Sequence, residues 1–88
     1  MLIIDSTAQM EEYCKEKLVA WYGRNYPSVR ISEENVFTVW LSKTLQNIKC
    51  IVSTNKLDGI MAEYTYNGDH HEMYEDVYKK LTNRVIES

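Results

Sequence analysis

The residues whose types and spacing could support chemistry are concentrated at residues 65–74, which read TYNGDHHEMY. His70 and His71 stand among carboxylates, and histidine and carboxylate side chains are common ligands of zinc. Neighbouring residues of a helix point about 100° apart, so two adjacent histidines could hardly bind the same ion from a helix. The helical spacing i, i+4 pairs only His71 with Glu75, and two ligands are too few for zinc. The sequence therefore predicts no metal site and no cofactor.

The candidate nucleophiles are the thiols of Cys14 and Cys50. Both cysteines fall within apolar segments, where a free cysteine behaves as a small hydrophobic residue. The chain contains no CxxC, HExxH or GxSxG motif and no glycine-rich phosphate loop. Without an assembled group of catalytic residues, we expect that the protein is not an enzyme.

Composition sets the remaining bounds. The 88 residues are 44% hydrophobic and 26% charged, which predicts one globular domain that spans residues 1–88. The apolar run at residues 1–4 is far too short for a signal peptide or a membrane span, so we expect a cytoplasmic protein with no membrane partner. The net charge of −3 has the wrong sign for general binding to phosphate backbones, which makes a nucleic-acid partner unlikely.

The first expected element is a helix over residues 7–22. Ser6 is the expected N-cap and Gln9, three residues later, completes a capping box. Gly23 is the expected stop signal. The apolar stripe recurs at i, i+4, i+8 and i+11 and comprises Met10, Cys14, Leu18 and Trp21.

Three strands are expected next, over residues 36–41, 49–53 and 60–66. Each is rich in β-branched, aromatic or alternating apolar residues, and short turns at residues 45–47 and 55–59 separate them.

The last expected element is a helix over residues 70–86. Asn67-Gly68 is a strong hairpin signal, but a hairpin needs a returning strand with a period of two. The apolar residues instead recur at i, i+3, i+4, i+7 and i+11, namely Tyr74, Val77, Tyr78, Leu81 and Val85. In this interpretation Asp69 is the N-cap and Glu72 its capping partner.

The expected fold is therefore α+β in the order α-β-β-β-α. A three-stranded antiparallel meander sheet carries both helices on one face. Because strand faces alternate, Trp40 points to the uncovered face if Phe37, Val39 and Leu41 point to the helices. That face would also carry Ile51, Met61 and Glu63, and would form a protein-binding surface. The opposite register places Trp40 in the core, and both registers stay open at this point.

An alternative interpretation is a nucleic-acid-binding protein. The order α-β-β-β-α is that of the double-stranded RNA-binding domain, an analogy of fold alone. Lys79, Lys80 and Arg84 would form its basic patch. Against this interpretation, acidic residues occupy the start of the expected second helix, where that domain carries lysines.

Several short motifs between residues 36 and 80 resemble a family of small uncharacterised proteins of Gram-positive bacteria and their phages and prophages. The motifs are KTLQN at residues 43–47, Ser53-Thr54, YNGD at residues 66–69, and the residues Tyr74, Asp76 and Tyr78-Lys79-Lys80. The resemblance implies a phage-linked setting in the bacterial cytoplasm and no known activity. We therefore expect a small phage- or prophage-encoded accessory protein that binds a host protein or a second copy of itself as a homodimer.

Overall fold

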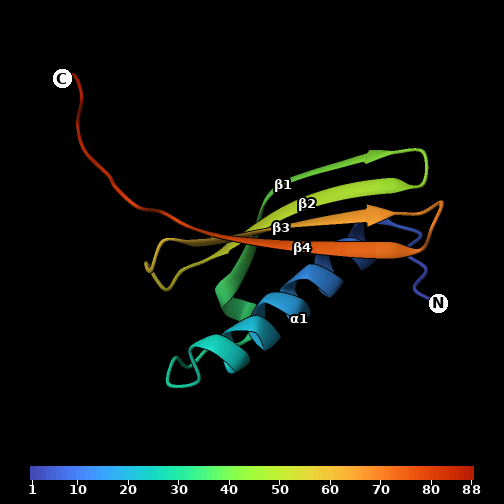
Figure 1. The fold of residues 1–88 in the computed structure, drawn as a ribbon, viewed down its shortest axis with the longest axis horizontal. Coiled ribbons are helices and arrows are strands. Elements are labelled where there is room, and N and C mark those ends of the chain that lie inside the picture. Colours follow the sequence, from blue (N-terminus) through green and yellow to red (C-terminus); the bar gives the residue numbers. More distant parts are fainter.

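The computed structural model describes residues 1–88 and contains one α-helix and one four-stranded antiparallel sheet (Figure 1). The expectation of an α+β fold is confirmed. Each strand pairs with the next along the chain, so the sheet is a meander in the order β1-β2-β3-β4. The elements are α1 (Thr7–Asn25), the 3₁₀ helix η1 (Glu33–Asn35), β1 (Val36–Thr44), β2 (Asn47–Thr54), β3 (Ile60–Asn67) and β4 (Glu72–Lys79).

The helix α1 begins where its capping residues place it. The Ser6 hydroxyl accepts a hydrogen bond from the Gln9 amide at 3.1 Å, and the Gln9 side chain accepts one from the Asp5 amide at 2.7 Å. The first bond satisfies the Gln9 amide, which the helix start leaves without a partner, and the second holds the residue that precedes the N-cap. The expected stop at Gly23 is wrong, because α1 continues to Asn25, close to Pro27.

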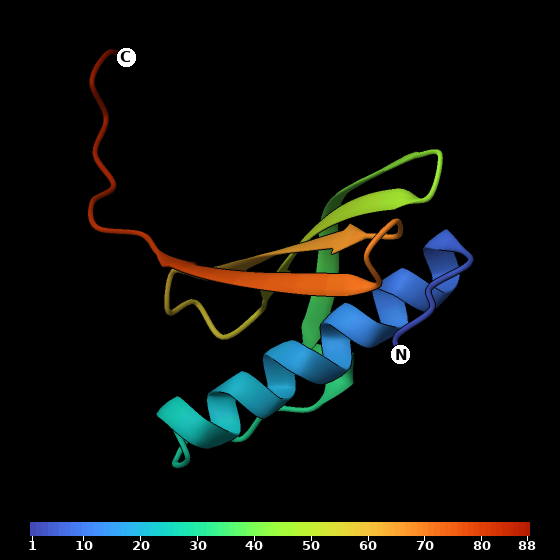
Figure 2. The same ribbon diagram turned by 45° about the vertical axis from the view of Figure 1, so that its right-hand side comes forward.

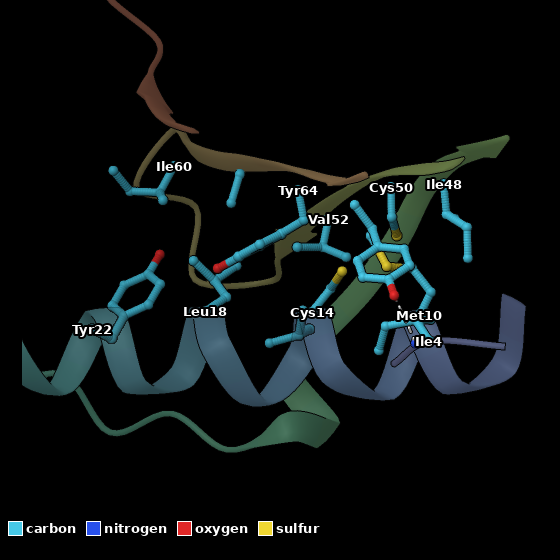
Figure 3. Close-up of a cluster of buried hydrophobic side chains, with 13 residues drawn as sticks. Ile4, Met10, Cys14, Leu18, Tyr22, Ile48, Cys50, Val52, Ile60 and Tyr64 are labelled. Carbon is cyan, nitrogen blue, oxygen red and sulfur yellow. Dashed lines mark hydrogen bonds between the residues drawn. The ribbon is translucent and has the colours of Figure 1, made fainter. Parts of the chain in front are cut away.

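The core lies between α1 and one face of the sheet (Figure 3). The buried stripe of α1 is Met10, Cys14, Leu18 and Tyr22. Tyr22 takes the place expected for Trp21, because the observed stripe advances by four residues at each step. Alternate residues of the two central strands meet this stripe, namely Ile48, Cys50 and Val52 of β2 and Ile60, Ala62, Tyr64 and Tyr66 of β3.

The expected second helix over residues 70–86 is wrong. Residues 72–79 form the strand β4, which pairs with β3 along its whole length. Residues 81–88, which we call the C-terminal arm, follow without helix or strand. Asp69 consequently caps no helix and lies in the β3–β4 turn, while Glu72 is the first residue of β4.

Residues 72–79 form a strand and not a helix because pairing with β3 gives hydrogen-bond partners to the backbone groups along the outer edge of β3. A central strand needs hydrogen-bond partners on both sides, whereas the charged i, i+4 pairs of a helix contribute only about 0.2–0.5 kcal/mol each. The strand also partly buries apolar residues, because Met73 and Val77 pack against the core from one face of β4. The hairpin signal of Asn67-Gly68 was thus correct, and the turn has four residues, 68–71.

With no second helix, the analogy with the double-stranded RNA-binding domain fails. Lys79 ends β4, Lys80 donates a backbone hydrogen bond to Gly59, and Arg84 lies in the C-terminal arm. These three cations therefore do not share a helix face as the RNA-binding interpretation required.

The arrangement of layers is asymmetric (Figures 1 and 2). In both views α1 runs along one side of the sheet, and no element covers the other side. The chain contains no helix that is both long enough and apolar enough to cross a lipid bilayer.

Candidate functional site

The candidate site is the sheet face that points away from α1, which we call the open face. Its side chains form rows across the four strands, because the register aligns each residue with one on the next strand. The first row is Phe37, Ser53, Met61 and Tyr78, the second is Trp40, Ile51, Glu63 and Asp76, and the third is Ser42, Lys49, Thr65 and Tyr74.

A bulge in β1 decides which face Trp40 occupies. Thr38 pairs with Val52 and Trp40 pairs with Ile51, so Val39 is an extra residue that opposes none of its own. The extra residue shifts the alternation by one place, and Phe37 and Trp40 therefore both belong to the open face. Half of the Trp40 surface is exposed, at 49%. Leu41 points to the helix layer as expected, whereas Phe37 and the exposed bulge residue Val39 do not pack against the core.

The open face brings together the four residues that the sequence indicated. Ile51 lies directly between Trp40 and Glu63 in the second row, and Met61 lies next to them in the first. Ile51 and Glu63 are half-buried by their neighbours, while Met61 and Trp40 are exposed. These side chains form one continuous surface over the three strands β1, β2 and β3.

The residues that β4 contributes to the open face were not predicted from the sequence. Tyr74, Asp76 and Tyr78 alternate along β4 and all point away from the core. The helical interpretation placed Tyr74 and Tyr78 on a buried stripe. The signal that identifies them is the alternation of Met73, Glu75 and Val77 with these residues, read together with the Asn67-Gly68 turn.

The charges of the open face are mostly negative. Glu63 and Asp76 are direct cross-strand neighbours, an arrangement that like charges disfavour. Lys49 offsets part of this charge through an ion pair with Glu63 at 3.6 Å, whereas Asp76 has no ion pair in the chain. Tyr74 donates a hydrogen bond to Glu72 at 2.7 Å, and this bond raises the pKa of the Tyr74 hydroxyl.

The helix side of the sheet carries polar groups that are already paired. Tyr64 donates a hydrogen bond to Glu75 at 2.6 Å, and Arg24 forms an ion pair with the same carboxylate at 3.7 Å. Burial and the contact with Glu75 raise the pKa of Tyr64 strongly. These contacts fasten α1 to β4 and serve the fold.

The two candidate nucleophiles face each other inside the core. Cys14 of α1 and Cys50 of β2 have no exposed surface and belong to the same core cluster. The neighbouring Cys50 thiol and burial raise the pKa of Cys14, which disfavours the reactive thiolate.

The histidines lie in the β3–β4 turn. His70 is exposed, and His71 approaches the hydroxyl of Tyr66 with its Nδ1 atom at 3.5 Å. No group of three or more His, Cys, Asp or Glu side chains is placed to hold a metal ion.

Comparison with known proteins places the chain in a family. The model of a family of unknown function, DUF6275, matches residues 11–88, and the chain belongs to this family. The matched residues include most of α1, the whole open face and the C-terminal arm. No curated protein and no solved structure matches the chain.

Proposed function

We propose that this DUF6275 protein is a small accessory protein, encoded by a phage or prophage, that acts by binding another protein through its open face. The observation that carries the proposal is the uncovered layer. A sheet with apolar side chains on both faces normally buries both, and here α1 covers only one. The uncovered apolar residues are Phe37, Trp40, Ile51, Met61, Tyr74 and Tyr78.

The composition of the open face favours a protein partner over a nucleic acid. Aromatic residues are enriched at protein interfaces, where they provide large contact areas and anchor binding. Aromatic platforms for single-stranded nucleic acids combine such residues with a positively charged groove. Here Glu63 and Asp76 stand between the aromatic residues, and Lys49 is the only cation of the three rows. This charge suits a partner with a basic surface.

The proposal of a phage or prophage origin rests on the motifs at residues 43–47 and 66–69. These residues lie in two neighbouring turns and the strand ends beside them, where the Asn47 side chain accepts a hydrogen bond from the Gly68 amide at 3.1 Å. A bacterial cytoplasm, with a host protein or a second copy as the partner, is the setting that this origin supports.

A binding role agrees with the environment of the two thiols. Nucleophilic catalysis by cysteine needs an accessible thiolate. Cys14 and Cys50 are instead part of the contact between α1 and β2. We therefore propose a non-catalytic function.

The test is an affinity capture from host cells with the tagged full-length protein. We expect that the wild-type protein retains a specific protein partner and that Trp40→Ala loses it by at least tenfold in recovered amount. Leu57→Ala is the control, because Leu57 is also a large apolar residue and is 95% exposed but lies in the β2–β3 turn, outside the open face. Circular dichroism establishes that each variant is folded.

A second variant, Tyr78→Ala, protects the test against misfolding of Trp40→Ala, because Tyr78 lies on another strand of the same face. The proposal fails if both face variants retain the partners of the wild-type protein. It also fails if the control loses them to the same extent.

A further inference from the structure

The C-terminal arm is the second feature that the fold leaves without contacts. It leaves the sheet after β4 and extends away from the body on the side opposite α1 (Figures 1 and 2). Its apolar side chains are almost fully exposed, with Leu81 at 94%, Val85 at 78% and Ile86 at 81%. Isolated apolar residues on a surface are ordinary, but three within six residues give the arm an apolar surface that the fold leaves uncovered.

The arm carries one arginine, Arg84, and one glutamate, Glu87, and Arg84 is the residue that complements the acidic open face. Arg84 is exposed and has no ion pair, and Asp76 is the carboxylate of the open face that has none. Asp76 lies between Tyr74 and Tyr78, which are its neighbours on the same face of β4. A guanidinium that contacts Asp76 would therefore also contact aromatic rings, and cation–π contacts favour arginine.

The arm and the open face also match in apolar surface and in size. In an extended chain Arg84 and Ile86 point to the same side, about 7 Å apart. Residues at this spacing can contact Asp76 and the apolar row of Met61 and Tyr78 together. The eight residues of the arm span at most about 26–29 Å, and the four strands are only about 14 Å across.

We infer that the open face binds the C-terminal arm of a second copy of this chain, so that two copies exchange their arms. The inference rests on the proposed function of the open face and names its partner. A second copy is favoured over the chain's own arm by direction. Lys80 is still held to Gly59 at 2.8 Å by its backbone amide, and the arm continues away from its own sheet.

An exchange of arms gives the self-complementary interface that a two-fold dimer requires. Each copy supplies one arm and one face, so both faces and both arms are covered in the dimer. Direct contact of two open faces around their acidic centres would bring Glu63 and Asp76 of each copy together. An intervening arm places Arg84 between these charges instead.

The experiment measures the dimer dissociation constant of full-length variants by sedimentation equilibrium. Asp76→Arg places an arginine face against an arginine arm, and Arg84→Asp places two aspartates together. We expect that each variant alone weakens the dimer at least tenfold. An equimolar mixture of the two variants should form a heterodimer, because both of its contacts pair an arginine with an aspartate. The double variant in one chain should dimerise for the same reason.

The matched control is Glu16→Arg, which makes the same change of charge on the exposed surface of α1. It should leave the dissociation constant within twofold of the wild-type value. A wild-type protein that is monomeric at 200 µM would overturn the inference. A dimer that the single variants do not weaken, or a mixture that does not associate, would overturn it as well.

This failure is distinguishable from failure of the proposed function. A monomeric wild-type protein that still captures a host protein through Trp40 would disprove the exchange of arms and leave the binding face intact. A charge-dependent dimer that captures no host protein would identify the second copy as the partner of the open face.

Discussion

Gly68 is required at its position by a neighbouring hairpin. A Cβ atom at Gly68 would lie 2.2 Å from the carbonyl oxygen of Gln46, in the β1–β2 turn. The side-chain amide of Gln46 also donates a hydrogen bond to the Asp69 carboxylate, which holds Gln46 against this turn. A glycine that reads as a simple turn residue therefore fixes the distance between the two turns at this end of the sheet.

We expect that Gly68→Ala lowers the free energy of unfolding by about 1–3 kcal/mol, because backbone atoms must move to admit the methyl group. Gly23→Ala is the matched control. It lies within α1 with no atom near its added Cβ, so it should raise the free energy of unfolding by about 0.5–1 kcal/mol. Urea denaturation of both variants measures the two effects, and a shift of equal sign would refute this explanation.

Tyr22 connects the end of α1 to the β2–β3 turn. Its hydroxyl donates a hydrogen bond to Asp58 at 2.6 Å, and Asp58 also accepts the Ile60 amide at 3.1 Å. Burial and the contact with Asp58 raise the pKa of Tyr22 from 10.0 to about 12. The neutral hydroxyl is thus the form that stabilises the fold.

We expect that Tyr22→Phe lowers the free energy of unfolding by about 1–2 kcal/mol at pH 8. The raised pKa means that this contribution is complete below pH 10 and is lost as the pH rises towards 12, because only the unfolded tyrosine ionises readily. The urea midpoints of wild type and variant should therefore converge between pH 10 and 12. Tyr26→Phe is the control, because its hydroxyl has no hydrogen-bond partner in the chain and its midpoint should follow the wild type.

At the scale of elements, the bulge of β1 is what makes the open face aromatic. Val39 opposes no residue of β2, and the strand is regular on either side of it. Phe37 precedes the extra residue and Trp40 follows it. They lie on the same face although they are three residues apart, which a regular strand does not allow.

Deletion of Val39 should therefore leave the fold and both faces unchanged. We expect a change in unfolding free energy of about 1 kcal/mol or less, because the deletion restores a regular register. Deletion of Ile51 is the control, because it reverses the faces of half of the central strand β2 and should prevent folding. Acrylamide quenching of Trp40 in a Trp21→Phe background reads the outcome. A Trp40 that becomes protected after deletion of Val39 would show that the bulge is assigned wrongly.

The elements also show which parts of the fold could be predicted. The helix start, the first three strands and the buried faces of β2 and β3 followed from Ser6, from alternation and from the two early turns. The last element did not, because its charges satisfy two patterns. Glu75 and Lys79 are i, i+4 partners on a helix, and they are equally alternate residues of a strand. Only the unpaired edge of β3, which is a tertiary property, decides between them.

For the whole molecule, the important property is the unequal cover of its two sheet faces. Trp40, Ile51, Met61 and Glu63 could be predicted from the sequence as neighbours on one face, with the register of Trp40 left open. The sequence could not decide which face Trp40 occupies, because the bulge at Val39 has no signature in the local amino-acid composition. Tyr74 and Tyr78 could not be placed on this face from the sequence, because the pattern of apolar residues there predicts a helix and not the strand β4. The sequence therefore predicts a site over three strands. The observed open face spans four strands, because residues 72–79 form β4 and not a second helix.

The unequal cover of the two sheet faces connects the binding of a host protein with the exchange of C-terminal arms. A sheet covered on one side by α1 needs a second cover, and the C-terminal arm needs a surface. The exchange of arms supplies both within one assembly, and a host protein with a basic, apolar segment would meet the same surface. Competition between the arm and such a segment is the behaviour that this shared surface implies.

The two outer strands have a consequence for aggregation. An open sheet exposes unpaired backbone groups along its edge strands, and such edges can polymerise into fibrils. Both edges here carry a protective feature. The bulge at Val39 disturbs the ladder of β1, and three acidic residues and a lysine occupy the eight positions of β4. The carboxylates that resemble the start of a helix in the sequence are thus placed to keep a sheet rich in aromatic residues from growing by a fifth strand.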